Sequence, residues 1–207
     1  MTDAYRFDES STEQAIAYAK IYAGENYFPA METVLKVAFS EKRNLPTFRL
    51  KSSDTILLSG YMKKWVGAYL AGYNNRPSVR TGNCSGTHPD PMAKTILRAR
   101  IPGLENNLAD KIVAGHSLLM TIENNIGELL EEYLAVKLSP LGWYCCWGST
   151  IDAVDFCKAD GSLLQIKTSD NSENSSSSRV RQGTPIEKWF RRFSRRPGVY
   201  NWESLNR

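Results

Sequence analysis

The spacing of apolar residues changes once along this chain, in the short segment around Pro140 and Gly142. Before it, apolar residues recur every three to four positions, which is typical of amphipathic helices. After it, short runs rich in aromatic and β-branched residues are separated by glycines, which is typical of strands. The pattern therefore predicts a domain that mixes α and β structure, with its helices mostly in the first two thirds.

The 207 residues include 42% hydrophobic and 23% charged side chains, which fits one soluble domain with a real core. No apolar run approaches the roughly 18–20 residues of a membrane span, and no secretory leader begins the chain. Four cysteines (Cys84, Cys145, Cys146 and Cys157) show no CxxC spacing. We therefore expect a cytoplasmic protein with no membrane partner, no disulfide framework and no zinc site.

Capping signals place the expected helices. Ser10 and Ser11 begin overlapping capping boxes for a helix that runs to about Ala23, and Pro29 suits the first turn of a second helix. Asp54 can cap a third. After the first helix, which ends at about 23, the expected helices cover 29–40, 56–72, 92–100 and 117–138. A loop is expected over 73–91.

The helix over 117–138 carries the acids of greatest interest. On a helical wheel its apolar face consists of Ile122, Ile126, Leu129, Leu130, Tyr133 and Leu134. Glu128 and Glu132 fall opposite this face, in solvent, whereas Glu123 falls within it and Glu131 on its border. A carboxylate on a buried face needs a partner, because an unpaired one is expensive. The alternative is a Glu123 whose head group lies in water at a frayed helix start.

Two β-prone runs, 151–158 and 163–168, flank the loop Ala159-Asp160-Gly161 and predict a hairpin. If the loop has three residues, paired residue numbers sum to 320, so Asp155 lies opposite Gln165 and shares a face with Lys167. If Asp160 and Gly161 instead form a two-residue turn, Asp152 takes that face. The three-residue loop is preferred, and Asp155 is the first candidate.

An acid, an amide oxygen and an ammonium on one surface suit phosphodiester hydrolysis. A carboxylate and a carbonyl oxygen can hold Mg²⁺, which neutralises phosphate charge and lowers the pKa of a bound water. Lys167 can position or deprotonate that water. The alternative is a surface hairpin with scattered polar residues.

The positive charge is concentrated at one end of the chain. The segment from Arg179 to Arg207 contains eight Lys and Arg residues and only two acids, Glu187 and Glu203. It therefore carries a net charge of +6, and the preceding residues carry −2. A basic end on a near-neutral body indicates contact with a polyanion, most often nucleic acid. The alternative is a solvated, solubilising terminus.

An acid-bearing helix, three strands and a further helix resemble the core of the PD-(D/E)XK nucleases. Gln165 here takes the place of the usual second acid, and no proline precedes Asp155. Within that superfamily, the chain is similar to the type II restriction endonucleases of the SinI type. The segments that carry this resemblance are Gln165 to Arg191, Val154-Asp155-Phe156 and Glu123-Asn124-x-x-Gly127-x-x-Leu130-Glu131-x-Tyr133.

The resemblance implies a central mixed β-sheet flanked by helices in one nuclease domain over 1–207. Residues 117–207 would form the catalytic core and the DNA-recognition segment, and 1–116 the helical part, for dimerisation or DNA contacts. It further implies a homodimer that cuts double-stranded DNA with Mg²⁺ at a short palindrome such as GGWCC or GGNCC, leaving 5′-phosphate ends. The implied catalytic residues are Asp155, Gln165, Lys167 and Glu123, all but Lys167 as metal ligands. A repair, junction or transposon-end nuclease and a non-catalytic DNA-binding protein are the alternatives.

The segment after Lys167 is a candidate DNA-recognition surface. Its polar run can bond phosphates or base edges, Arg179 and Arg181 suit guanine, and a basic helix from Ile186 to Arg196 would follow. The candidate DNA contacts are Asn171, Ser172, Glu173, Asn174, Ser175, Arg179, Arg181, Lys188, Arg191 and Arg192. The alternative for 171–178 is a Ser/Asn-rich linker.

Overall fold

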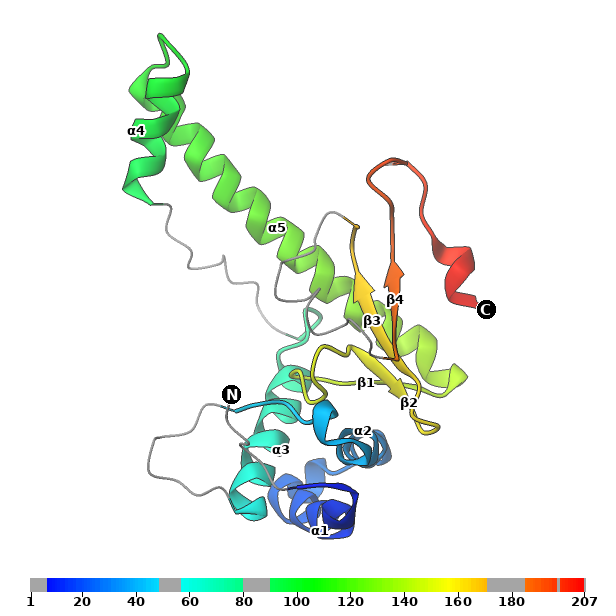
Figure 1. The fold of residues 1–207 in the computed structure, drawn as a ribbon. Helices are drawn as coiled ribbons and strands as arrows, with labels where there is room; N and C mark the ends of the chain where they lie inside the picture. The colour runs from blue at the N-terminus through cyan, green and yellow to red at the C-terminus, as the bar shows by residue number, and fades with distance from the viewer. Residues whose placement is uncertain (1–6, 49–56, 80–89, 171–184, 197, 207) are drawn as a thin grey trace.

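A computed structural model describes residues 7–48, 57–79, 90–170, 185–196 and 198–206. It confirms a mixed α and β architecture in which a four-stranded sheet is flanked by helices (Figure 1). In the described residues no helix is both long and apolar enough to cross a membrane.

Three helices form a compact bundle on one side of the sheet: α1 (Thr12–Ala23), α2 (Pro29–Ser40) and α3 (Leu58–Asn74). Pro29 occupies the first turn of α2, where its missing N–H has no intrahelical acceptor to lose. The aromatic side chains of α3 are core residues, and Tyr61, Trp65 and Tyr69 are fully buried. The Trp65 indole donates to the carbonyl of Thr150 at 2.9 Å, which fastens the bundle to the loop that precedes the second strand.

Helix α4 (Pro91–Arg100) and the first half of α5 (Asn106–Leu138) form an arm that extends away from the rest of the molecule (Figure 1). Asp90 caps α4 by accepting from the N–H of Met92 at 2.8 Å. The 33 residues of α5 begin 11 positions before the expected start at Ser117. The expected start at Ser117 is wrong, and the helix runs through Gly115, because one glycine inside a helix is tolerated when its neighbours continue the helical pattern.

The sheet has the order β1 (Trp143–Cys145), β2 (Phe156–Lys158), β3 (Leu163–Lys167) and β4 (Ile186–Phe190). The first two pairings are antiparallel and the third is parallel, so the sheet is mixed, as the resemblance implies.

Strand β4 corrects the helix expected from Ile186 to Arg196. Ile186–Phe190 pairs with all five residues of β3, and the side chain of Trp189 in this strand is buried. Thr184 as an N-cap residue and Pro185 at the first helical position favoured a helix locally. Pairing with a central strand and burial of the indole outweigh that preference, since β structure depends strongly on its tertiary neighbours.

The register of the β2–β3 hairpin is confirmed. Phe156 pairs with Leu164 and Cys157 with Leu163, and each pair of numbers sums to 320. Gly161 closes the three-residue loop with a φ of 89°, in the left-handed region that favours glycine. The expected strand over 151–158 is shorter than predicted, because the chain turns through Ala153 at a φ of 58° before β2 begins.

The two faces of the sheet have different partners. One face joins the α1–α3 bundle through Cys157 and Leu163, and the other packs on the second half of α5 through Phe156 and Leu164. The side chains that α5 buries there are Leu130, Leu134 and Leu138. The predicted apolar face is therefore only partly correct, because Ile122, Leu129 and Tyr133 are exposed.

Candidate active site

Asp155 is held between two strands immediately before β2. Its N–H donates to the carbonyl of Leu164 at 3.0 Å, and its own carbonyl accepts from Cys146 at 2.8 Å. Its carboxylate oxygen Oδ2 accepts from the N–H of Ile166 at 2.6 Å. Since Ile166 lies between Gln165 and Lys167, this bond fixes the carboxylate at the part of β3 that carries both residues.

Gln165 is buried in the middle of β3, with 6% of its surface exposed. Its side-chain oxygen Oε1 is inaccessible and has no hydrogen-bond partner among the described residues. Leaving a buried acceptor unsatisfied costs about 1–3 kcal/mol, so such atoms in folded proteins usually have a functional or structural reason. An amide oxygen is also a ligand that a hard divalent cation accepts.

Lys167 is the last residue of β3 and is half-buried. It lies two positions after Gln165, so both side chains leave the strand on the same face. Its carbonyl accepts from the N–H of Arg191 at 2.9 Å, which ties the end of β3 to the residue after β4. The lysine therefore stands where the candidate site meets the basic C-terminal segment.

Glu131 is the helix acid that the structure brings to this site. The pKa of the Glu131 carboxyl is raised to about 7, mainly by burial and also by the negative charge of Asp155, while the positive charge of Lys167 opposes the shift. Glu123 is exposed eight residues earlier on α5, roughly 12 Å away along the helix axis. The helical wheel placed Glu131 on the border of the apolar face, and this position was the sequence signal that could have identified it.

Asp152, the alternative to Asp155, is exposed and lies outside the strands. Its N–H donates to the carbonyl of Asn44 at 2.9 Å, so its backbone fastens the loop to the segment after α2. The three-residue loop of the hairpin, rather than a two-residue turn, is the reason that Asp155 reaches β3 instead.

The oxygen ligands around Gln165 fit a divalent cation that keeps most of its water. Asp155 and Glu131 offer carboxylates, Gln165 offers an amide oxygen that no described residue bonds, and Mg²⁺ binds through few protein ligands. Within the described residues no group of three or more His, Cys, Asp and Glu side chains could hold a metal ion by itself. A cation here would therefore depend on the amide of Gln165 and on water.

Most of the predicted DNA contacts lie outside the described residues. These are Asn171, Ser172, Glu173, Asn174, Ser175, Arg179 and Arg181. Of the described ones, Lys188 is half-buried on β4, with its Nζ 5.7 Å from the centre of the Phe190 ring.

Arg191 and Arg192 follow β4 directly and are half-buried. The guanidinium of Arg191 lies 5.4 Å from the centre of the Tyr200 ring. The Nε atoms of both arginines are inaccessible and have no hydrogen-bond partner within the described part of the chain. Both guanidinium groups are cationic and lie next to the end of β3, where charge favours the approach of anionic oxygens.

Asp170 has a positioning role that sequence reasoning missed. Its Oδ1 accepts from the N–H of Ser194 at 2.7 Å, and its Oδ2 accepts from the Ser194 hydroxyl at 3.1 Å. The bonds from Ser194 lower the pKa of the Asp170 carboxyl, so it stays ionised at neutral pH. They join the segment after β3 to the segment after β4, and a residue directly before a Ser/Asn run gave no signal of this.

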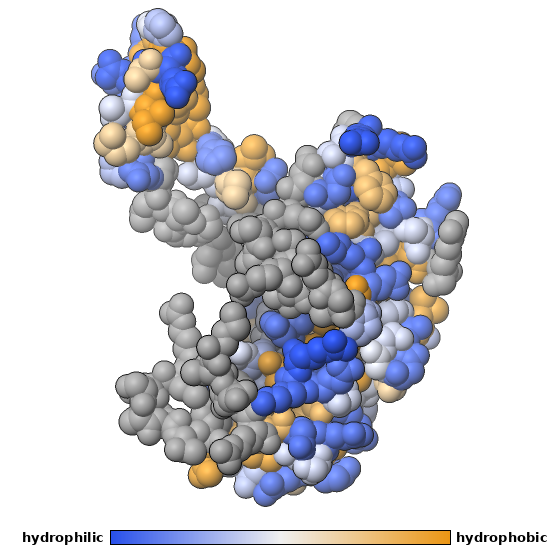
Figure 2. Space-filling view, in the orientation of Figure 1, coloured by the Kyte–Doolittle hydropathy of each residue, from blue (hydrophilic) through white to orange (hydrophobic). Residues whose placement is uncertain are grey.

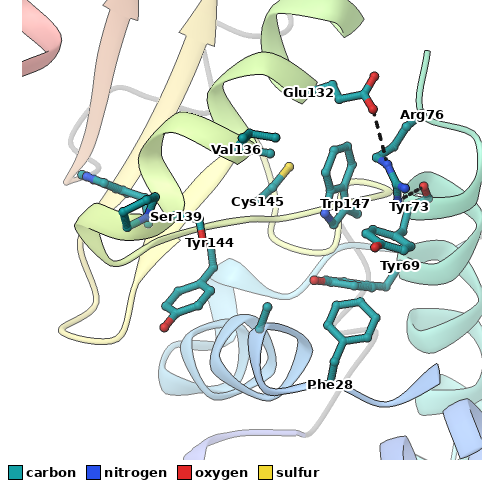
Figure 3. A pocket seen from close by; sticks show the side chains of 14 residues that line it. Phe28, Tyr69, Tyr73, Arg76, Glu132, Val136, Ser139, Tyr144, Cys145 and Trp147 are labelled. Carbon is teal, nitrogen blue, oxygen red and sulfur yellow. Dashed lines mark hydrogen bonds and ion pairs between the residues drawn. The ribbon is translucent and has the colours of Figure 1, made fainter. Parts of the chain in front are cut away.

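A separate aromatic pocket of about 510 Å³ lies between α2, α3, α5 and β1 (Figure 3). The Arg76 guanidinium lies 3.6 Å from the centre of the Tyr73 ring, and Arg76 Nε is 3.5 Å from a carboxylate oxygen of Glu132. Glu132, expected in solvent, is therefore paired. Of Asp155, Gln165, Lys167 and Glu131, none lines this pocket, so the cluster around Gln165 is a different site.

The four-stranded mixed sheet flanked by helices is the architecture of a restriction-endonuclease-like core. The family model of the SinI restriction endonuclease matches residues 55–207, and the chain belongs to this family.

Two curated proteins are similar to the chain over 124 residues. The type II restriction enzyme SinI of Salmonella infantis is 46% identical, and the type II restriction enzyme Eco47I of Escherichia coli is 44% identical. Each match covers 58% of this chain and 53% of the relative. The chain thus spans about half the length of the curated relatives that it matches.

Proposed function

We propose that the protein is a Mg²⁺-dependent type II restriction endonuclease that hydrolyses phosphodiester bonds in duplex DNA at a short palindrome and leaves 5′-phosphate ends. The observation that carries this proposal is the buried oxygen of Gln165, which has no hydrogen-bond partner among the described residues and lies on β3 beside Ile166, whose N–H holds Asp155, and two residues before Lys167. Membership of the family and the names of the two relatives support the same activity.

Asp155, Gln165 and Glu131 would hold the cation in this proposal, with Glu131 in the place first expected for Glu123. Bound Mg²⁺ would supply Lewis acidity toward the phosphate and make its bound water more acidic. Asp155 is positioned by the N–H of Ile166, which donates to its Oδ2. Lys167 would orient or deprotonate the attacking water and stabilise the negative charge of the transition state.

The basic C-terminal segment would hold the DNA. Lys188, Arg191 and Arg192 would contact phosphates next to the catalytic residues, because the N–H of Arg191 already bonds the carbonyl of Lys167. The polar run and the two arginines in 171–184 would read base edges. Sites such as GGWCC or GGNCC are the first sequences to test.

A palindromic site requires two active sites related by a two-fold axis, so the functional unit would be a homodimer. The three described cysteines, Cys145, Cys146 and Cys157, are buried free thiols. Buried thiols without disulfides fit action in the reducing cytoplasm.

The test is a digest of unmethylated phage-length DNA by the purified protein, with Mg²⁺ and separately with EDTA. The proposal predicts discrete bands with Mg²⁺ only, and mapping of their ends gives the site and the terminal phosphates. A smear, or cutting only of branched or damaged DNA, would favour the repair-type alternative. Tight binding of duplex DNA without cutting in either tube would favour a non-catalytic protein.

A further inference from the structure

Helix α5 carries a second apolar stripe that the described part of its own domain does not cover. Its positions alternate in steps of four and three along most of the helix. They are Leu108, Ile112, Gly115, Leu119, Ile122, Ile126, Leu129, Tyr133 and Val136. A repeat of seven with two apolar positions is the pattern of a coiled-coil seam, and here it lasts about four heptads.

The stripe lies on the surface. Of its large side chains only Ile126 is half-buried, while Leu119 and Leu129 are each 53% exposed and Val136 is 69% exposed. Tyr133 also contacts the ring of Trp202, with ring centres 6.1 Å apart. Figure 2 shows apolar side chains gathered on the arm, with little of the molecule around them.

The helix buries a different stripe within the chain. Ala109 is fully buried on the side of α4, and Lys94 of α4 bonds Asp110 at 2.7 Å. Farther along, Leu130 and Leu134 are buried against the sheet. These positions follow the exposed ones by one residue, which is about 100° around the helix, so α4 and the sheet leave the heptad stripe open.

We propose that this stripe is the dimer interface, and that its occupant is α5 of a second copy of the chain. The proposal deepens the homodimer of the proposed function by naming its contact surface. Seven exposed large side chains at about 100 Å² each would bury roughly 700 Å² per protomer, close to the roughly 800 Å² that one partner buries in a stable interface. A patch of this size is unusual on a monomer.

The polar residues beside the stripe favour an antiparallel pair. Lys111 and His116 flank its first half, and the exposed acid Glu123 flanks its second half, where Glu132 is already paired with Arg76. When two copies run in opposite directions and are centred between Leu119 and Ile122, His116 of each copy lies beside Glu123 of the other. Glu123, which is exposed and distant from Glu131, then flanks the interface.

The first experiment measures the mass of the full chain in solution by sedimentation equilibrium, without DNA or metal. The wild-type protein is expected to be a dimer at micromolar concentration and the double variant L119E/I122E a monomer. Met120→Glu is the matched control, because Met120 is 46% exposed on the same helix but lies outside the stripe, and it should remain a dimer. Circular dichroism checks that all three proteins keep their helices.

A second variant is expected to strengthen the dimer. A Cβ added at Gly115 would meet no atom within 4 Å, and the position is exposed, so Gly115→Leu should complete the seam without disturbing the protomer. We expect the dissociation constant of the dimer to fall by at least about tenfold. Gly60→Leu on α3 is the control for helix propensity, because Gly60 is equally open, and it should leave that constant unchanged.

A wild-type protein that is monomeric at tens of micromolar, or a double variant that still dimerises, would overturn the proposal. A monomeric wild-type protein would indicate that a further segment of a longer polypeptide covers the stripe. Because the readout is mass, failure of this proposal and failure of nuclease activity are distinguishable. A protein that dimerises through α5 but does not cut DNA would contradict only the proposed function.

Discussion

The two halves of α5 have similar apolar content but different surroundings. The second half buries Leu130, Leu134 and Leu138 against the sheet, whereas the first half exposes Leu108 and Leu119 on the arm. An apolar helix face therefore indicates that a partner exists, without indicating whether the partner belongs to the same chain. The sheet is the partner of one face in the second half, and we infer a second protomer over the exposed stripe that runs along both halves.

The acids of the helix differ in the same way. Glu131 lies in the half that packs on the sheet, and burial beside Asp155 raises its pKa to about 7. Glu123 lies closer to the arm and is exposed. Packing against the sheet thus selects which glutamate can join the cluster of Asp155, Gln165 and Lys167.

The largest effect is expected from a truncation in the buried half. Leu134 is 1% exposed, and Leu134→Ala should lower the free energy of unfolding by about 2–5 kcal/mol, because a cavity remains in the core. Met120→Ala on the arm should change it by less than about 0.5 kcal/mol. Urea unfolding of both variants measures the difference, and equal effects would contradict the contrast between the two halves.

The pH dependence of stability should separate Glu131 from Glu123. The pKa of Glu131 is raised in the folded state, so folding favours its protonated form and burial of the ionised form is penalised. The penalty is absent below about pH 4.5, grows between pH 4.5 and 7, and is complete above pH 7.

Glu131→Gln should therefore stabilise the metal-free protein on the order of 1–3 kcal/mol at pH 8 and hardly at pH 4. Glu123→Gln is the matched control and should change little at either pH. Thermal unfolding in EDTA across this range is the measurement. A gain from Glu131→Gln that is the same at both pH values would show that its ionisation is not the cause.

A smaller effect is expected at Gln165, where one substitution should raise stability and weaken the response to Mg²⁺. Gln165→Met keeps the length of the side chain and removes an unsatisfied buried oxygen, so the metal-free protein should gain about 1 kcal/mol. The same change should reduce the rise in melting temperature that Mg²⁺ causes in the wild-type protein. A variant that loses stability and keeps the full response to Mg²⁺ would remove Gln165 from the site.

The smallest effects are expected where the site meets DNA. Arg191→Ala and Arg192→Ala should each weaken binding to all duplex sequences and reduce the log–log salt slope by about 1. Lys63→Ala, an exposed lysine of α3, is the control. Fluorescence anisotropy at several salt concentrations measures the slopes, and unchanged slopes would show that both arginines face away from DNA.

Local rules in the sequence were sufficient for the hairpin. Gly161 at the end of a three-residue loop determined the register of β2 with β3, and with it the selection of Asp155 over Asp152. Pro29 similarly marked the start of α2. Each of these features depends on a few neighbouring residues, whose conformational preferences are visible in the sequence.

The features that the sequence did not predict depend on tertiary contacts. Strand β4 carries helix-start signals at its beginning but pairs with β3. The selection of Glu131 over Glu123 required knowledge of which part of α5 lies on the sheet. The helix wheel merged two apolar stripes of α5 into one face, because periodicity alone does not separate an intramolecular partner from an intermolecular one.

The most direct test of the candidate active site is Lys167→Ala, with cleavage and binding of the same duplex DNA measured in Mg²⁺. The lysine is expected to act in the chemical step, so the variant should bind DNA nearly as tightly as the wild-type protein and show no detectable cutting. Lys63→Ala should bind and cut normally. If Lys167→Ala cleaves at a rate near that of the wild-type protein, the assignment of this cluster as the nuclease site is wrong.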